Sequence, residues 1–150
     1  MPEYPEEFIL KPYRTMFTIR RLEEMVSELA MASEIPITES TIVGAAAGAA
    51  MTGMCPVVEI MFQDFLTVCM DQIINQAAKM RFMTGGQVTM PIVISSPGCF
   101  LMSSAAQRSQ SLEDIFMHIP GLKICVASNP TDFKGLLKTA IRDDNPVLFF

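Results

Sequence analysis

Apolar residues recur at helical spacing in several parts of the chain. Between residues 12 and 31 they lie three or four positions apart, with charged pairs between them, which predicts an amphipathic helix. A second helix is predicted over residues 40–52, where small apolar residues follow a capping Thr38 or Ser40 and stop at Gly53. A long helix is predicted over residues 64–84, before a Gly-Gly pair.

Two further helices follow nearer the C-terminus. The stretch from Ser111 to Asp114 has the form of a capping box before a short helix, which Pro120 ends. Asn129 and Pro130 are placed to begin the last helix. Its apolar positions define one face and are Phe133, Leu136, Leu137, Ala140 and Ile141.

Short, continuous apolar runs separate these helices, and they predict buried strands. They cover residues 56–61, 90–95, 123–127 and 147–150. Because strands that are apolar on both faces alternate with helices, the pattern predicts an α/β fold with a mostly parallel sheet and helices on both faces. In such a fold, ligands gather at the carboxyl ends of the strands.

Composition narrows the class of protein. Half of the 150 residues are hydrophobic, 18% are charged and the net charge is −5, which excludes a disordered tail and speaks against binding nucleic acid. The uncharged run 40–58 is interrupted by Gly53 and Pro56, so we expect a close-packed soluble helix and no membrane span. Four scattered cysteines, one histidine and an acidic, proline-broken N-terminus favour a cytoplasmic protein without a secretory signal or a His-based metal site.

Glu39 stands directly before the uncharged run and is the main candidate for chemistry. One reading is a carboxylate that faces water and interacts favourably with a helix N-terminus. The other is a carboxyl group in an apolar site, where burial favours its protonated form and lets it hold a proton near neutral pH. No phosphate loop of Walker type, no Gly-x-Gly-x-x-Gly and no Ser-His-Asp order is present to suggest another chemistry.

Several ordered motifs extend this reading. They lie at residues 37–40, 44–54, 56–65, 71–79, 105–111, 118–123 and 140–146. Among them are Glu-Ile-Met-Phe-Gln-Asp-Phe at 59–65 and Ala-Ala-Gln-Arg-Ser-Gln at 105–110. Together they resemble the transketolase-like pyrimidine-binding domain of the beta subunit of thiamine-diphosphate-dependent 2-oxo acid dehydrogenases. The sequence at 59–65 is more similar to acetoin dehydrogenase than to the pyruvate enzyme.

The resemblance implies a role for four residues. Glu39 would hydrogen-bond a ring nitrogen of the cofactor's aminopyrimidine and so promote loss of the thiazolium proton. Phe65 would stack on the pyrimidine, with Ile37 and Met61 beside it, although ordinary core packing is the alternative for these three. Glu59, inside a strand, is expected to be a buried structural carboxylate without a catalytic role.

The same resemblance implies a possible potassium ion, held by backbone carbonyls and an acidic side chain. The matching positions are Ile92, Ala140, Ile141, Asp143 and Asn145. For Asp143 and Asn145, a simple turn at a helix end is an equally good reading of the sequence.

Arg108 departs from the family pattern because it stands where the family has a histidine that assists acyl transfer to a lipoyl group. Arginine keeps its charge near neutral pH and cannot shuttle a proton, so acyl transfer is in question even where cofactor activation survives.

The two ends of the chain also depart from the pattern. Residues 1–35 resemble the start of the alpha subunit, and 36–150 form an incomplete pyrimidine-binding domain. The resemblance implies that the beta subunit's own first helix and strand and its C-terminal domain are absent, and the sequence contains no Gly-Asp-Gly motif for magnesium and diphosphate.

These features predict half of a cofactor site. The chain would form an oligomer with an alpha-type subunit that binds diphosphate and magnesium, and would serve a lipoyl-bearing acyltransferase. The alternative is a non-catalytic remnant or interaction module that keeps the fold and the assembly surface.

Overall fold

The computed structural model describes residue 21 and residues 38–98 and 104–150. The chain divides into two compact units, and the second, Thr38–Phe150, contains all of the described residues except Arg21. The helix predicted over residues 12–31 therefore lies outside the described residues apart from that one position.

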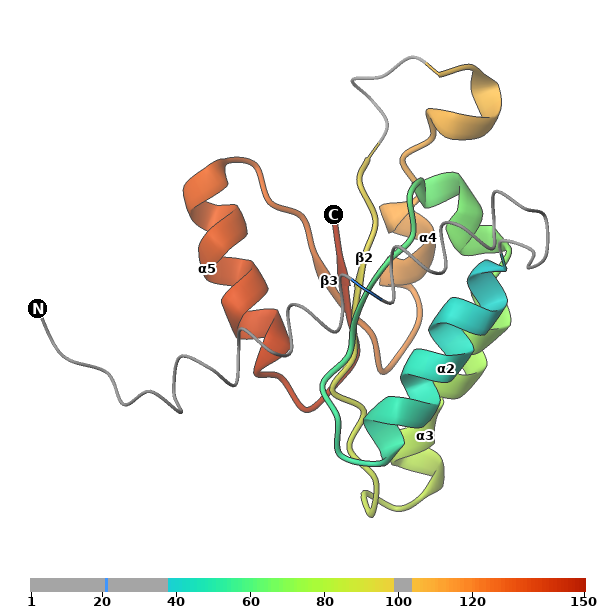
Figure 1. Ribbon diagram of the computed structural model, residues 1–150, viewed down its shortest axis with the longest axis vertical. Helices are drawn as coiled ribbons and strands as arrows, with labels where there is room; N and C mark the ends of the chain where they lie inside the picture. Colours follow the sequence, from blue (N-terminus) through green and yellow to red (C-terminus); the bar gives the residue numbers. More distant parts are fainter. Residues whose placement is uncertain (1–20, 22–37, 99–103) are drawn as a thin grey trace, which may run out of the picture. The chain divides into compact units, whose positions relative to one another are not determined.

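Four parallel strands form the sheet of this unit (Figure 1). In chain order they are β1 (Val57–Glu59), β2 (Val93–Ser95), β3 (Lys123–Cys125) and β4 (Val147–Phe149). Their order across the sheet is β1-β2-β4-β3, so the chain moves in one direction across the sheet from β1 to β3 and turns back after β3 to place β4 between β2 and β3. The α/β class and the parallel sheet predicted from the sequence are confirmed.

Most helices cover one face of the sheet. These are α2 (Glu39–Met51), the helical stretch from Gln63 to Met83, and α4 (Glu113–Met117). Their buried side chains form one cluster with every second residue of the strands, and this cluster includes Val43, Leu66, Ile73, Ile94, Phe116 and Leu148. The larger core of the unit therefore lies between this layer of helices and the sheet.

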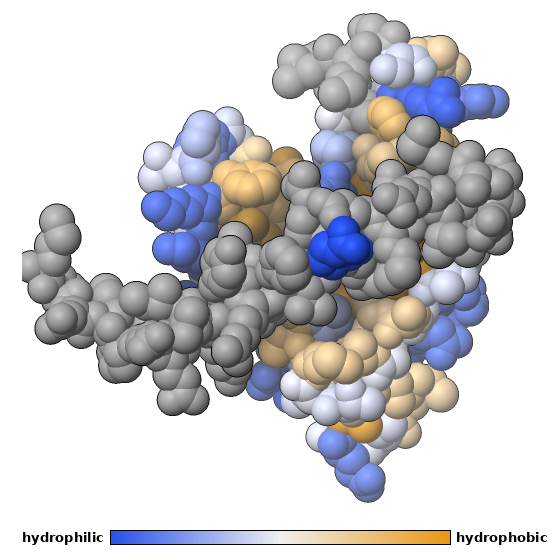
Figure 2. All heavy atoms as spheres, in the orientation of Figure 1, coloured by the Kyte–Doolittle hydropathy of each residue, from blue (hydrophilic) through white to orange (hydrophobic). Residues whose placement is uncertain are grey.

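Helix α5 (Pro130–Ile141) covers part of the other face. Ala140 is buried there with Val93, Val147 and Phe149, and the ring of Phe133 meets that of Phe149 edge-on at 4.9 Å. The predicted apolar face is only partly buried, because Phe133, Leu136 and Ile141 stay 44%, 37% and 38% exposed. Figure 2 shows orange apolar atoms on the surface of this helix beside blue charged ones.

The single long helix predicted over residues 64–84 is wrong in detail. The stretch consists of a 3₁₀ helix, η1 (Gln63–Thr67), a π-helix, η2 (Gln72–Ala77), and an α-helix, α3 (Ala78–Met83). Side chains compete for its backbone carbonyls: Thr67 Oγ1 donates to Asp64 O at 2.7 Å, and Cys69 Sγ to Leu66 O at 3.5 Å. Such local side-chain bonds favour tighter turns over a regular α-helix.

The three predicted helix N-caps had different outcomes. Thr38 is the N-cap residue of α2, but no side chain caps that helix. Asn129 caps α5 as expected, because its Oδ1 accepts from Asp132 N at 2.9 Å. The capping box before α4 is wrong: Leu112 is the N-cap and no side chain caps the helix. Instead, Leu112 N donates to Gln63 Oε1 at 2.6 Å. None of the described helices has the length and apolar character needed to cross a membrane.

Candidate functional site

The carboxyl ends of β1 and β2 are joined by a buried hydrogen bond. Ser96, fully buried directly after β2, donates from Oγ to Ile60 O at 2.9 Å, and Ile60 N donates to Ser95 O at the same distance. This pairing fixes the point where the chain leaves β1 and enters η1. The residues around that point form the candidate site.

Glu39 lies near the end of η1, although the two are far apart in sequence. It is the half-buried first residue of α2, and the next residue, Ser40, donates from Oγ to Val68 O at 2.8 Å. Burial raises the pKa of the nearby Cys69 thiol to about 11, and the negative charge of Glu39 acts in the same direction. The tertiary structure therefore brings the N-terminus of α2, with Glu39, to the end of the segment that carries Phe65.

Two phenylalanines form an aromatic corner at this edge of the sheet. The rings of Phe62 and Phe65 meet edge-on with centroids 5.5 Å apart. The guanidinium carbon of Arg108 lies 5.9 Å from each ring centroid, within the range of a cation–π interaction. Arg108 belongs to the short helix η4 (Ala106–Arg108), and within the described residues it forms no ion pair.

Two buried polar side chains of η1 hold the segment that follows Arg108. Asp64 Oδ1 accepts from Gln110 Nε2 at 2.6 Å, and Gln63 Oε1 accepts from Leu112 N at the same distance. Gln63 and Asp64 are only 1% and 7% exposed. Because neither bond can shift without leaving a buried polar group unpaired, the pair fixes the position of Arg108 over the rings.

Sequence reasoning assigned no role to Gln63 and Asp64. The signal that could have found them is a pair of polar residues shortly after a predicted strand, inside an otherwise apolar stretch. Asp64 Oδ2, Ser109 Oγ and Glu113 Oε2 are also buried at atom level without a hydrogen-bond partner. Polar atoms are therefore buried among the apolar side chains at the carboxyl ends of β1 and β2.

The remaining predicted residues have mixed outcomes. Met61 follows β1 and is 59% exposed, while Ile37 lies outside the described residues. Glu59 was expected to be buried, and this is wrong, because the residue is exposed. The reason is its place on β1, at one end of the strand order, whereas α5 packs against β4 two strands away.

The residues predicted to hold potassium gather at the opposite edge of the sheet. Asp143 N donates to Ala140 O at 3.1 Å, and Asp143 Oδ1 accepts from Asn145 N at 2.9 Å. Ile92 O accepts from Val147 N at 2.9 Å, which closes the loop onto β2.

The side-chain oxygens of that loop are already in use. Asp143 Oδ2 is paired with Lys123, whose hydrogen bond is the main reason that the pKa of Asp143 lies below its ordinary value. Asn145 Oδ1 accepts from Arg81 Nη1 at 2.8 Å. The described residues hold no cluster of three or more metal-binding side chains. The side-chain oxygens of Asp143 and Asn145 therefore already have partners within the protein, and potassium binding through backbone carbonyls stays a prediction.

Comparisons with known proteins agree with this architecture. The sequence model of the family described as "Transketolase, pyrimidine binding domain" matches residues 17–150. Among solved structures, a "Split gene transketolase, inactive beta4 tetramer" has a TM-score of 0.62 over 75% of this chain and 34% of its own chain. Its sequence is only 18% identical, so this similarity shows the fold alone.

Curated relatives are more similar in sequence. The beta subunit of acetoin:2,6-dichlorophenolindophenol oxidoreductase from Cupriavidus necator is 53% identical over 116 residues, which are 77% of this chain and 34% of that subunit. The beta subunit of the pyruvate dehydrogenase E1 component from Porphyra purpurea is 49% identical over 117 residues, which are 78% of this chain and 35% of that subunit. The chain thus spans about a third of the length of these relatives. It belongs to the family of transketolase-type pyrimidine-binding domains, with beta subunits of acetoin and pyruvate dehydrogenases as homologues.

Proposed function

We propose that this chain supplies the pyrimidine-binding half of a thiamine diphosphate site in the decarboxylase component of an acetoin or pyruvate dehydrogenase. The observation that supports the proposal is the hydrogen bond of 2.8 Å from Ser40 to Val68 O, which holds the residue next to Glu39 at the end of the segment that bears Phe65. Family membership supports the choice of cofactor.

Each residue of the proposed half-site has a distinct role. Glu39 holds a proton at a ring nitrogen of the aminopyrimidine, Phe65 offers a ring face for stacking, and Met61 adds an apolar contact. The family resemblance assigns the same kind of contact to Ile37, which lies outside the described residues. Thiamine diphosphate, when bound, supplies the nucleophilic carbon that attacks a substrate carbonyl group. The chain's contribution is to place the pyrimidine and to control one proton.

The proposed site needs a partner. Because the sequence has no Gly-Asp-Gly motif, an alpha-type subunit would bind the diphosphate and magnesium, and a lipoyl-bearing acyltransferase would accept the product. The relatives named above are themselves subunits, which supports assembly with another chain. We therefore expect no oxidation of acetoin or pyruvate by the isolated chain.

The test compares Glu39→Gln with Glu59→Gln in the complex with an alpha-type partner. Glu39→Gln keeps the shape of the side chain but removes its ionisable proton. Exchange of the cofactor's thiazolium proton, followed by NMR, should slow by about 100-fold or more while cofactor binding is retained. Glu59 is exposed and lies in β1, so its variant should exchange at the wild-type rate. Equal rates in both variants would exclude the proposed role of Glu39.

One observation favours a second candidate, a non-catalytic module that keeps the fold. The Arg108 guanidinium lies 5.9 Å from the centroid of Phe65, the ring proposed to stack on the pyrimidine. If it blocks that ring, the wild-type complex should fail to bind thiamine diphosphate in calorimetry, whereas Arg108→Ala should bind it. Binding by the wild-type complex would instead leave the catalytic reading in place.

A further inference from the structure

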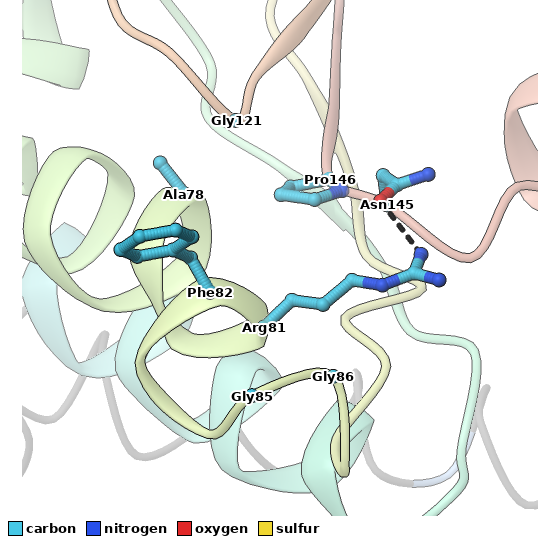
Figure 3. Close-up of a pocket in the computed structure, with 8 residues that line it drawn as sticks. All are labelled: Ala78, Arg81, Phe82, Gly85, Gly86, Gly121, Asn145 and Pro146. Atoms are coloured by element: carbon cyan, nitrogen blue, oxygen red, sulfur yellow. Dashed lines mark hydrogen bonds between the residues drawn. The ribbon is translucent and has the colours of Figure 1, made fainter.

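A cavity of about 430 Å³ lies at the edge of the sheet opposite Glu39, between the end of α3 and the loops that precede β3 and β4 (Figure 3). Its volume is within the range of pockets that bind small molecules, roughly 300–1,000 Å³. The residues that line it are Ala78, Arg81, Phe82, Gly85, Gly86, Gly121, Asn145 and Pro146.

One side of the cavity is apolar and open to solvent. The ring of Phe82 stands beside Ala78, and Pro146 lies across from them in the close-up view (Figure 3). Phe82 is 88% exposed, and none of the described aromatic rings contacts it. A large exposed ring at the mouth of a cavity offers a flat face to an apolar ligand.

The other side carries one fixed positive charge. Arg81 Nη1 donates to Asn145 Oδ1 at 2.8 Å and makes a longer contact of 3.5 Å with Asp144 O. Its Nη2 and Nε atoms donate to no described residue, and no carboxylate forms an ion pair with it. A guanidinium held on one side with donors free on the other is suited to a carboxylate ligand.

The walls of the cavity are held in place by the backbone. Gly121 has φ of 99°, and a Cβ atom there would lie 2.0 Å from Ala78 O, so the loop before β3 packs directly on the helix. Lys79 Nζ donates to Pro120 O at 2.6 Å and strengthens the same contact. At the other wall, Gly86 N donates to Arg81 O at 2.8 Å. The two walls therefore have fixed positions before any ligand binds.

We propose that this cavity binds a small carboxylate with a flat apolar body, of the class of aryl carboxylates. The apolar body lies against Phe82 and Pro146, and the carboxylate accepts hydrogen bonds from the free N–H groups of Arg81. The site is separate from the proposed half-site at Glu39, and it stands whether or not the chain binds thiamine diphosphate.

The first experiment uses the full chain and three probes in NMR titrations. Benzoate has both the ring and the charge, benzamide has the ring alone, and acetate has the charge alone. Benzoate should give saturable shifts at Arg81, Phe82 and the Gly85-Gly86 loop. Its affinity should exceed that of benzamide by about tenfold, the size expected for a hydrogen bond to a charged group. It should exceed that of acetate by about tenfold or more, because acetate has no ring to bury against Phe82 and Pro146.

The second experiment separates the two sides of the cavity with variants. Arg81→Gln should remove the preference for benzoate over benzamide, while Phe82→Ala should weaken both. Lys138→Gln and Phe133→Ala, which change exposed residues of α5, are the controls and should bind as wild type does. If Arg81→Gln fails to fold, the three wild-type titrations decide alone. Equal affinities for benzoate and benzamide, or shifts that map away from α3, would overturn the proposal.

Discussion

At the scale of single residues, Cys55 and Cys69 differ in exposure, and burial raises the thiol pKa of Cys69. Cys55 is exposed, whereas Cys69 is fully buried and its pKa is raised to about 11, first by burial and then by the charge of Glu39. Because the thiolate is the reactive form, an alkylating agent at pH 8 should modify Cys55 and spare Cys69 in the folded protein. Peptide mass mapping after a timed reaction reads each site separately. Equal labelling of both would contradict the burial of Cys69.

The same pKa shift makes a prediction about stability and pH. The folded-state pKa of Cys69 lies above its ordinary value of 9.0, so folding favours the protonated thiol. That contribution is fully present below pH 9 and should be lost as the pH rises from 9 toward 11. Urea unfolding at pH 8 and pH 10.5 should show a larger fall in stability for the wild type than for Cys69→Ala. An identical fall in both proteins would show that other groups cause it.

At the scale of elements, the two longest described α-helices begin in different ways. Asn129 caps α5 with a side-chain bond of 2.9 Å to Asp132 N, while Thr38 precedes α2 without any side-chain cap. Asn129→Ala should therefore cost about 1 kcal/mol of unfolding free energy, the usual value of a lost N-cap. Thr38→Ala is the matched control and should change stability by no more than a few tenths of that. Denaturant unfolding measures the unfolding free energy of both variants. If the two variants lose the same amount, the Asn129 side-chain bond contributes no more than the control position does.

The irregular stretch from Gln63 to Met83 shows how one element serves two needs. Its first turn must aim Gln63 and Asp64 at the segment after Arg108, whereas its later residues Ile73 and Ala77 must fill the core against α2. A straight α-helix keeps one buried face along its length. The change from 3₁₀ to π geometry alters the direction in which successive side chains point. Gln63 and Asp64 can therefore face the segment after Arg108 while Ile73 and Ala77 face the core. Irregular turns of this kind are frequent near functional sites.

At the scale of the whole molecule, the outward side of α2 is available for assembly. Ile42 and Met51 are 40% and 43% exposed, and Gly48 is an exposed glycine with open space around its Cα. A small-residue helix face lets a second backbone approach closely, so we predict that the chain self-associates or binds its partner through α2.

Light scattering at micromolar concentration tests this prediction. Gly48→Gln places a long side chain on the outward face and should shift the protein toward monomer. Gly135→Gln on α5 also enters open space and serves as the control, since it should leave the assembly intact. A wild-type protein that is monomeric throughout the concentration range would contradict the assembly prediction.

Local sequence information was enough to determine the class of fold and much of its order. The apolar runs around Ile94 and Leu148 are buried central strands, as their composition predicts, because strands covered on both faces need apolar side chains on both. The runs around Val58 and Ile124 also form strands, but these lie at the edges of the sheet and stay partly exposed. Asn129 and Gly53 mark helix ends through bonds and backbone angles that involve only near neighbours. Periodicity and capping act over a few residues, so a sequence displays them directly.

Only the tertiary structure decided how these parts meet. Leu112 N pairs with Gln63, 49 residues away, and the capping box expected beside it does not form. The strand order β1-β2-β4-β3 leaves Glu59 exposed, although its apolar neighbours suggested burial. The position of Arg108 over two rings, the contact between α2 and η1 beside Glu39, and the cavity at Arg81 also join distant segments. Their geometry depends on how the sheet and helices pack, and no pattern along the chain encodes that packing locally.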